Sequence, residues 1–161
     1  MVGQRHIHPP HLLNLRSINH LKENILPEII NRFAGPYGFL SNFHVEADGK
    51  TVEHRFQAAK ATNSIDHARI MGASTPGQAK GFGRHVNLRT DWEDVKTVVM
   101  AELVAQKFQN PELRGLLIGT GDAVLIEGNT WGDKYWGVDL RNSEGANILG
   151  ITLMAVRASL R

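Results

Sequence analysis

Three polar residues at helical spacing are the first candidates for chemistry in this sequence. Glu53, Gln57 and Lys60 stand at positions i, i+4 and i+7, so they share one face of a helix. A second stripe with the same spacing is apolar and consists of Val52, Phe56 and Ala59. Because the two stripes are neighbours, Glu53 and Lys60 lie at the boundary of a core, where burial shifts pKa values. About 10 Å separates them along the helix axis. The stripe is therefore either the rim of a pocket or an ordinary solvated polar face.

The segment from Trp131 to Gly137 is the second concentration of candidate residues. It holds Trp131, Asp133, Tyr135 and Trp136 within seven positions, together with glycines that allow close approach of the backbone. Such a segment suits a planar ring stacked on an aromatic side chain, with an acid or hydrogen-bond acceptor beside it. The alternative is an aromatic anchor that fixes a long loop to the core.

Two glycine-containing segments carry weaker signals. Gly81-Phe82-Gly83-Arg84 lacks the preceding strand of a phosphate loop, so its glycines are expected to end a helix. Arg84, with Lys80 and Arg89 nearby, either meets a phosphate or belongs to an exposed basic patch. Gly121 and Asp122 follow Thr120 ahead of an apolar run and form either part of a site or only a turn.

Several familiar chemistries are excluded. The sequence has no P-loop, no His-Glu-x-x-His zinc pair and no Gly-x-Ser-x-Gly elbow. It has no cysteine, which excludes disulfides and thiolate sites. His6-Ile7-His8 has no carboxylate at ligand spacing, so we expect no metal site and no cofactor.

Composition bounds the class of protein. The 161 residues fit one domain, with 42% hydrophobic and 21% charged residues. The net charge of +2 does not supply the basic stripe of a nucleic-acid-binding module. Because the sequence has neither a long apolar run nor a secretory signal at its start, we expect a cytoplasmic protein with no membrane partner.

The composition changes near Asn31. Residues 1–30 hold four of the eight histidines and the Pro9-Pro10 pair, and they end in an amphipathic stretch from Leu21 to Ile30. We interpret them as an N-terminal extension and residues 31–161 as the functional domain.

Turn and capping signals predict the elements of that domain. Asp48-Gly49 indicates a hairpin turn, and Ala123–Ile126 a buried strand. Helices are expected over 51–63, from Ser64 to Gly72, from Thr75-Pro76, after a capping box at 90–93, over 110–119 and over 145–160. The long helix after residue 93 is expected to bury Val95, Val99 and Leu103. The fold class is α+β, a single helix-rich domain with a small β-sheet.

The ordered set of segments resembles the NADAR (YbiA-like) family over about Asn31 to Arg157. The matching segments are Phe39-Leu40-Ser41-Asn42-Phe43, Thr51 to Lys60, Gly83-Arg84, Asp91-Trp92 with Lys96 and Met100, Lys107-Phe108 before Asn110-Pro111, Leu117 with Thr120-Gly121-Asp122, Glu127, Asp133, Trp136-Gly137, Gly145-x-Asn147-x-Leu149-Gly150, Leu153-Met154 and Arg157. Any one of these motifs is weak, but their order is specific. The extension is a departure, because such domains commonly begin close to the first of these segments.

The resemblance implies an N-glycosidase with the YbiA-like fold, which cleaves the bond between ribose C1′ and a base nitrogen. The implied catalytic residues are Lys60, which forms a Schiff base with C1′, and Glu53, with Asp133 as a second carboxylate. The residues expected to bind substrate are Phe39, Asn42, Gln57, Arg84, Trp92, Gly121, Asp122, Trp136 and Asn147. Oxocarbenium chemistry at C1′ agrees with this set, since a carboxylate stabilises the cation and an acid protonates the departing nitrogen.

Three substrates or roles stay open. The first expectation is removal of ADP-ribose from ADP-ribosylated guanine in DNA or RNA. The second is hydrolysis of a ribosylamino-pyrimidine phosphate from riboflavin biosynthesis. The third is a non-catalytic ADP-ribose or nucleotide-binding module, although a binder has less need of a lysine together with carboxylates.

Overall fold

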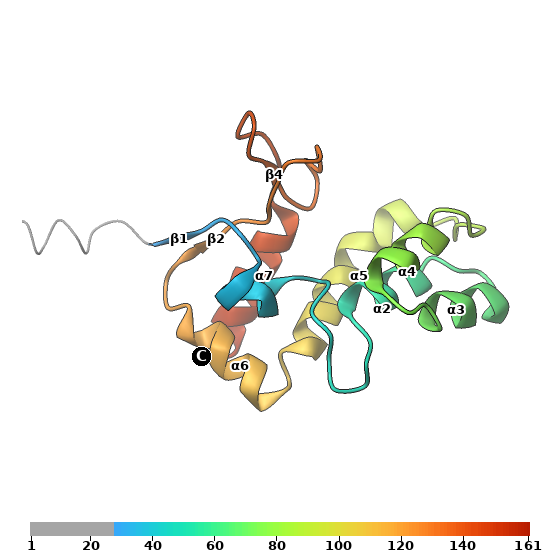
Figure 1. Ribbon diagram of the computed structural model, residues 1–161, viewed down its shortest axis with the longest axis horizontal. Coiled ribbons are helices and arrows are strands. Elements are labelled where there is room, and N and C mark those ends of the chain that lie inside the picture. Colours follow the sequence, from blue (N-terminus) through green and yellow to red (C-terminus); the bar gives the residue numbers. More distant parts are fainter. Residues whose placement is uncertain (1–27) are drawn as a thin grey trace, which may run out of the picture.

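Helices dominate the computed structural model, which describes residues 28–161 (Figure 1). The helices in this range are η1 (Gly35–Leu40, a 3-10 helix), α2 (Val52–Ala58), α3 (Ser64–Met71), α4 (Pro76–Gly83), α5 (Trp92–Lys107), α6 (Pro111–Gly119) and α7 (Ile148–Ser159). The strands are β1 (Ile29–Ile30), β2 (Val124–Leu125), β3 (Gly128–Asn129) and β4 (Val138–Asp139). The expected α+β, helix-rich fold is confirmed. The proposed N-terminal extension lies outside the described residues except at its last three positions.

The small sheet is divided into two separate pairs. β1 pairs with β2, and β3 pairs with β4, both in parallel. β1 aligns Ile30 with Leu125, and both side chains are buried. Ile30 therefore joins the core one residue before Asn31, where the composition changes.

The long helix α5 connects two halves of the molecule. One half contains α2, α3 and α4, and the other contains α6, α7 and β2. α2 packs against α3, α4 and α5, and α5 also packs against α7. α7 contacts β2 and α6 in the other half, and the segment that carries β4 projects from it (Figure 1). The main core spans both halves and consists of Ile30, Phe39, Leu40, Val52, Phe56, Trp92, Met100, Val104, Phe108, Leu113, Leu117, Ala123, Leu125, Leu149, Leu153 and Val156.

Two short helices begin where local capping predicts. The Thr75 side chain accepts a hydrogen bond from the Gln78 N–H and precedes Pro76 at the start of α4. Asn110 caps α6 in the same way and precedes Pro111. These caps use groups within one turn of the chain, so the sequence alone is sufficient to predict them.

The helix expected over 51–63 is shorter than predicted. α2 ends at Ala58, and α3 starts after Asn63, whose side chain caps it in place of Ser64. Ala61 forms a β-bridge with Leu88, and the Lys60 carbonyl accepts the Arg89 N–H at 3.1 Å. Pairing with a distant segment therefore interrupts the helix.

The capping box at residues 90–93 is wrong, because the N-cap of α5 is Asp91 rather than Thr90 and the Glu93 carboxylate binds the Lys96 Nζ. Asp91 makes no side-chain capping bond, and Arg89 binds both of its carboxylate oxygens at 2.6 and 2.8 Å. The buried stripe of α5 is also shifted from the expected one. Its fully buried residues are Trp92, Met100, Val104 and Lys107, whereas Val95, Val99 and Leu103 are only partly buried.

Two further boundaries differ from expectation. The Asp48-Gly49 turn forms, with the Glu46 N–H donating to the Lys50 carbonyl at 2.8 Å, but no strand flanks it in the described chain. α7 begins at Ile148 rather than Gly145, since Asn147 adopts a left-handed conformation with φ of 53°.

Among residues 28–161, no helix combines the length and apolar character needed to cross a bilayer.

Candidate active site

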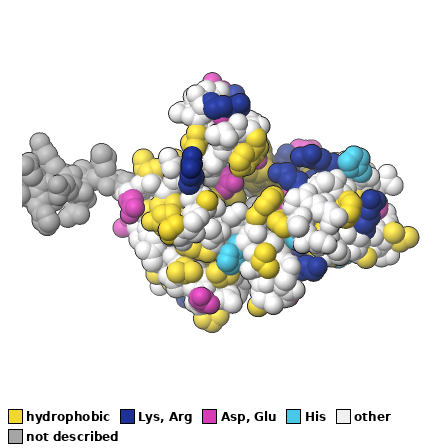
Figure 2. All heavy atoms as spheres, in the orientation of Figure 1, with side chains coloured by type: hydrophobic (Ala, Val, Ile, Leu, Met, Phe, Trp, Pro, Cys, Tyr) yellow, Lys and Arg dark blue, Asp and Glu magenta, His cyan; other side chains and the backbone are white. Residues whose placement is uncertain are grey.

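A cavity of about 390 Å³ lies between α2, α4 and α5 on one side and the segment around β3 and β4 on the other. The space-filling view shows a notch between the projecting β4 segment and the helical half, where Lys and Arg side chains gather (Figure 2). The cavity is lined by Ser41, Asn42, Phe43, Glu53, Phe56, Gln57, Lys60, Lys80, Trp92, Glu93, Lys96, Met100, Glu127, Trp131, Asp133, Trp136 and Leu149.

The cavity brings together the three candidate catalytic residues and four of the candidate binding residues. The four binding residues are Asn42, Gln57, Trp92 and Trp136. Segments far apart in the sequence thus meet at one cavity.

Five other candidate residues do not line the cavity. Phe39 is buried in the core. Arg84 is exposed at the C-terminal end of α4. Gly121 and Asp122 form an exposed turn, where Arg161 binds the Asp122 carboxylate at 2.7 Å. Asn147 bonds to the backbone, through its side-chain oxygen to the Glu127 N–H at 3.0 Å and through its nitrogen to the Leu125 carbonyl at 2.9 Å.

The two residues of the polar stripe that lie on α2 are buried and Lys60 beyond its end is partly buried, which excludes a solvated face. Glu53 and Gln57 are 6% and 5% exposed, and the Gln57 Nε2 donates to Glu53 Oε1 at 2.8 Å. α4 approaches closely at Gly83, where a Cβ would come within 2.0 Å of the Gln57 Oε1. Glycine at this position therefore lets α4 hold Gln57 against Glu53.

Burial also shifts the pKa values of the two ionisable residues of this stripe. Removal from water raises the pKa of Glu53, although the Gln57 hydrogen bond and the nearby Lys80 and Lys60 oppose the rise. The pKa of Lys60 is lowered, first by burial and then by the positive charges of Lys80 and Arg84, against the opposing effect of Glu53. The Lys60 ammonium lies 5.7 Å from the centre of the Trp92 ring. Lys60 is therefore easier to deprotonate than an exposed lysine.

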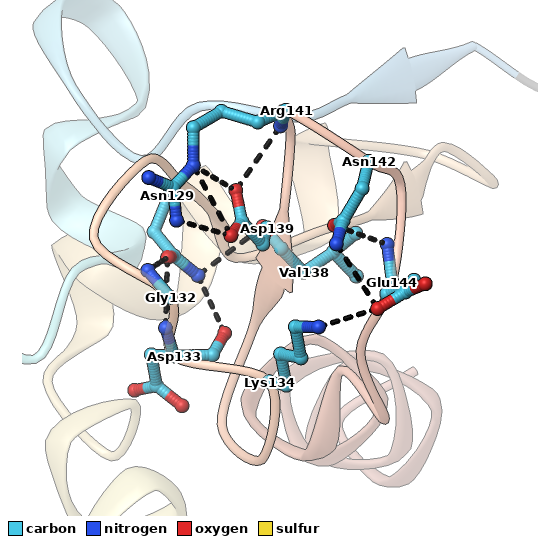
Figure 3. A network of polar contacts seen from close by, with 9 residues as sticks. All are labelled: Asn129, Gly132, Asp133, Lys134, Val138, Asp139, Arg141, Asn142 and Glu144. Atoms are coloured by element: carbon cyan, nitrogen blue, oxygen red, sulfur yellow. Dashed lines mark hydrogen bonds and ion pairs between the residues drawn. The ribbon is translucent and has the colours of Figure 1, made fainter.

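Asp133 is fixed by hydrogen bonds within its own loop. Its Oδ1 accepts the backbone N–H groups of Tyr135 at 3.1 Å and Trp136 at 3.0 Å. The buried Asn129 holds the turn before it, since its Oδ1 accepts from Gly132 and Asp133 and its Nδ2 donates to the Asp133 carbonyl at 2.7 Å (Figure 3). The Asp133 carboxylate points away from this network in Figure 3.

The aromatic loop is anchored to the core and also lines the cavity. Trp136 packs edge-on against Phe56, with ring centres 5.2 Å apart, and so anchors the loop to the core. It also lines the cavity, as does Trp131, which is 69% exposed. The cavity thus has buried aromatic rings inside and an exposed indole among its lining residues.

Four ionisable residues that line the cavity were not among the predicted catalytic or substrate-binding residues: Lys80, Glu93, Lys96 and Glu127. Lys96 follows Trp92 by four residues on α5 and pairs with Glu93. Helical spacing from Trp92 could have indicated Lys96. Glu127 belongs to a matching segment of the resemblance, but no local pattern distinguishes it from a surface glutamate.

Comparison with known proteins places the chain in a family. Residues 31–161 match the NADAR domain family. The chain is 42% identical to the N-glycosidase Npun_R5314 of Nostoc punctiforme over 138 residues, which cover 78% of this chain and 87% of that protein. The NMR structure of Escherichia coli YbiA has 38% sequence identity and a TM-score of 0.71, with 84% of this chain and 87% of that one covered. A riboflavin biosynthesis protein of Vibrio vulnificus, VVA0006, is 34% identical over 78% of this chain but only 36% of its own length.

The family match and the relatives identify the chain as an N-glycosidase, a hydrolase that acts on N-glycosyl bonds. The chain belongs to the NADAR domain family.

Proposed function

We propose that this protein removes ADP-ribose from ADP-ribosylated guanine in nucleic acid, with Lys60 as a covalent nucleophile. The observation that carries the proposal is the presence of Lys60 and Glu53 in one cavity, with the pKa of each shifted towards its neutral form. A lysine attacks only as the neutral amine, which a partly dry site near other cations favours.

The covalent route uses groups that the cavity contains. The neutral Lys60 amine bonds to ribose C1′ as the bond to the base nitrogen breaks. One amine proton reaches the departing base, and the other reaches the ring oxygen as the ribose opens, which leaves an imine. Glu53 is placed to relay the proton that reaches the ring oxygen, and Asp133 supplies a second carboxylate for the cationic character that develops at C1′. Water then hydrolyses the imine and regenerates the lysine.

The remaining lining residues support a substrate that carries phosphates and an aromatic base. Lys80 and Lys96 contribute two positive charges to the cavity. Trp92 and Trp136 offer ring surface for a base, and base–aromatic stacking is worth about 1–3 kcal/mol. The exposed Trp131 suits a substrate that extends beyond the cavity, as ADP-ribose on guanine does.

A second candidate is a ribosylamino-pyrimidine phosphate from riboflavin biosynthesis. Its support is the name of the Vibrio vulnificus relative and the modest size of the cavity, about 390 Å³, which suits a compact monophosphate. The same Lys60 and Glu53 chemistry applies to both substrates, because the reacting C1′–N bond is common to them.

Parallel assays of the two substrates decide between the two candidate functions. The purified protein is offered DNA that carries ADP-ribosyl-guanine and, separately, the ribosylamino-pyrimidine phosphate, and products are followed by mass spectrometry. We expect release of ADP-ribose and restoration of unmodified guanine. Turnover of the pyrimidine substrate alone would overturn the first candidate, and turnover of neither would favour a binding module.

Trapping of the imine tests the role of Lys60. Borohydride reduces an imine to a stable amine, so its addition during turnover should leave a sugar adduct on the peptide that contains Lys60. Lys60→Ala should lose the adduct and about 10³-fold or more of the activity. Lys60→Arg keeps the charge but offers no neutral amine, so it should fail equally. An active Lys60→Arg enzyme would instead assign the attack to an activated water.

A further inference from the structure

Glu127 stands apart from the other carboxyl groups of the cavity because one of its oxygens is buried without a hydrogen-bond partner among the described residues. It follows β2 and lines the cavity. The oxygen concerned is Oε2, which is closed off from solvent.

The backbone of Glu127 is held in place from two directions. Its N–H donates to the Asn147 Oδ1 at 3.0 Å, and its carbonyl accepts the Val138 N–H at 2.9 Å. Gly137 packs against it so closely that a Cβ there would come within 2.2 Å of the Glu127 carbonyl oxygen and 2.9 Å of its Cγ. Asn147, which does not line the cavity, thus positions a residue that does.

The other three carboxylates in the cavity already act as hydrogen-bond acceptors. Glu53 Oε1 accepts from Gln57, Glu93 Oε2 accepts from Lys96, and Asp133 Oδ1 accepts two backbone N–H groups. No hydrogen-bond donor among residues 28–161 binds the buried Oε2 of Glu127. The geometry therefore favours the proton on Glu127 rather than on the other three carboxyl groups.

The charges around Glu127 also favour its protonated form. Burial raises the pKa of Glu127 to about 7, and the negative charges of Asp133 and Glu53 act in the same direction. Lys80 from α4 and Lys107 from α5 oppose the rise. A carboxylic acid with such a pKa is present in quantity at neutral pH and can be regenerated after it gives up its proton.

We propose that Glu127 is the general acid that protonates the departing nitrogen. As the C1′–N bond breaks, its electron pair goes to that nitrogen, and the proton moves from the Glu127 carboxyl to the same atom. Glu127 is left as a carboxylate and regains a proton from the nucleophile, whether that is the Lys60 amine or water. The assignment rests on N-glycosyl cleavage and not on the identity of the substrate.

The first test needs no substrate. Carbon NMR of protein labelled at glutamate side-chain carboxyls should show one resonance that titrates near pH 7 and is missing in Glu127→Gln. Asp133→Asn should lower this titration midpoint, because it removes the negative charge that contributes most to the rise after burial. Titration of the Glu127 carboxyl near pH 4.5 would overturn the proposal even if the proposed substrate is correct.

The second test is kinetic. On whichever substrate the wild type cleaves, Glu127→Gln should lose about 10²- to 10⁴-fold in kcat, the usual contribution of a general acid. Its kcat/KM should also lose the decline at alkaline pH, since that decline reports ionisation of the acid. Glu127→Asp keeps an acid and should retain the alkaline decline with partial activity.

Controls separate this role from a structural one. Glu102→Gln makes the same chemical change on an exposed position of α5 and should leave kcat unchanged. A loss of less than tenfold in Glu127→Gln, or a retained alkaline decline, would overturn the assignment. If Glu127→Gln fails to fold, the Glu127→Asp profile and the wild-type titration decide. If borohydride traps no Lys60 adduct in the wild type but the Glu127 variants behave as expected, the covalent route is contradicted and Glu127 is still the general acid.

Discussion

Burial controls the ionisable side chains around this cavity, and Lys107 shows it most clearly. This lysine is 2% exposed, and its Nζ donates to the Ser41 carbonyl at 2.7 Å. Burial lowers its pKa to about 8, although Glu46 and Glu127 act against the change. Ser41 lines the cavity, so the hydrogen bond from the buried Lys107 ammonium holds the backbone of one lining segment in place.

The lowered pKa of Lys107 predicts how stability depends on pH. An unfolded lysine keeps its proton to about pH 10.4, whereas the folded one loses it near pH 8. Between these values the unfolded chain binds more protons, so the contribution to the free energy of unfolding rises with pH, by about 3 kcal/mol in total. Urea denaturation should show the wild type gaining this amount relative to Lys107→Met between pH 7 and 10.5. If the difference in free energy of unfolding between the wild type and Lys107→Met does not change with pH, burial does not lower the pKa of Lys107.

Residue types and spacing were sufficient to find the catalytic candidates but not to decide which neighbours share the site. Glu53 lies on α2 and Lys60 stands two residues beyond its end, so the local course of the chain brings both to the cavity. Asp122 and Asn147 belong to equally polar segments, yet one binds Arg161 and the other binds backbone groups. Those partners lie 39 and 20 residues away, and no local pattern specifies them.

At the scale of elements, the loop between β3 and β4 is held by side chains rather than by strand pairing. β3 and β4 contribute only two residues each. Asn129 is 2% exposed and bonds to the Gly132–Asp133 backbone and to the Val138 carbonyl. Asp133 then holds Trp136 by its backbone N–H. One carboxamide therefore orients both an acid and an aromatic wall of the cavity.

Asn129→Ala should lower activity more than it lowers stability. Removal of its hydrogen bonds frees the Asp133 turn, and we expect kcat/KM to fall by about 10²-fold, as when a catalytic group is misplaced by about 1 Å. Lys134→Ala is the matched control, because it removes only the surface pair with Glu144 from the same network (Figure 3). Equal losses in both variants, or normal kinetics with a lower Tm in Asn129→Ala, would show that the network only stabilises the fold.

Elements whose ends are set locally were predictable, and those set by distant contacts were not. α4 and α6 begin at the expected caps because Thr75 and Asn110 bond within their own first turn. α2 stops early because Ala61 pairs with Leu88, so a tertiary partner outweighs propensity at this end. The capping box fails for a local reason, since α5 is capped at Asp91 and Glu93 pairs with Lys96.

At the scale of the whole molecule, the cavity exists because two halves close around it. α2, α4 and α5 supply the Glu53, Lys60 and Lys80 side of the cavity, while the segment after β2 supplies Glu127 and Asp133. β2 is tied to β1 through the Glu28 and Ile30 carbonyls. The stability of β1 therefore bears on the position of the second wall.

Two truncations test where the folded unit begins. Removal of residues 1–27 should keep a cooperative thermal transition and full activity, because β1 and its pairing with β2 remain. Removal of residues 1–31 also deletes Ile30, which is 4% exposed in the core, together with the carbonyls that accept from Val124 and Ile126. Loss of a buried isoleucine side chain costs about 2–5 kcal/mol. The longer truncation should therefore lower Tm by several degrees, and it should lower kcat as the segment that carries Glu127 loosens.

Loss of folding in the shorter truncation would show that residues before Glu28 belong to the folded unit. Equal stability of both truncations would show that β1 contributes nothing to the core.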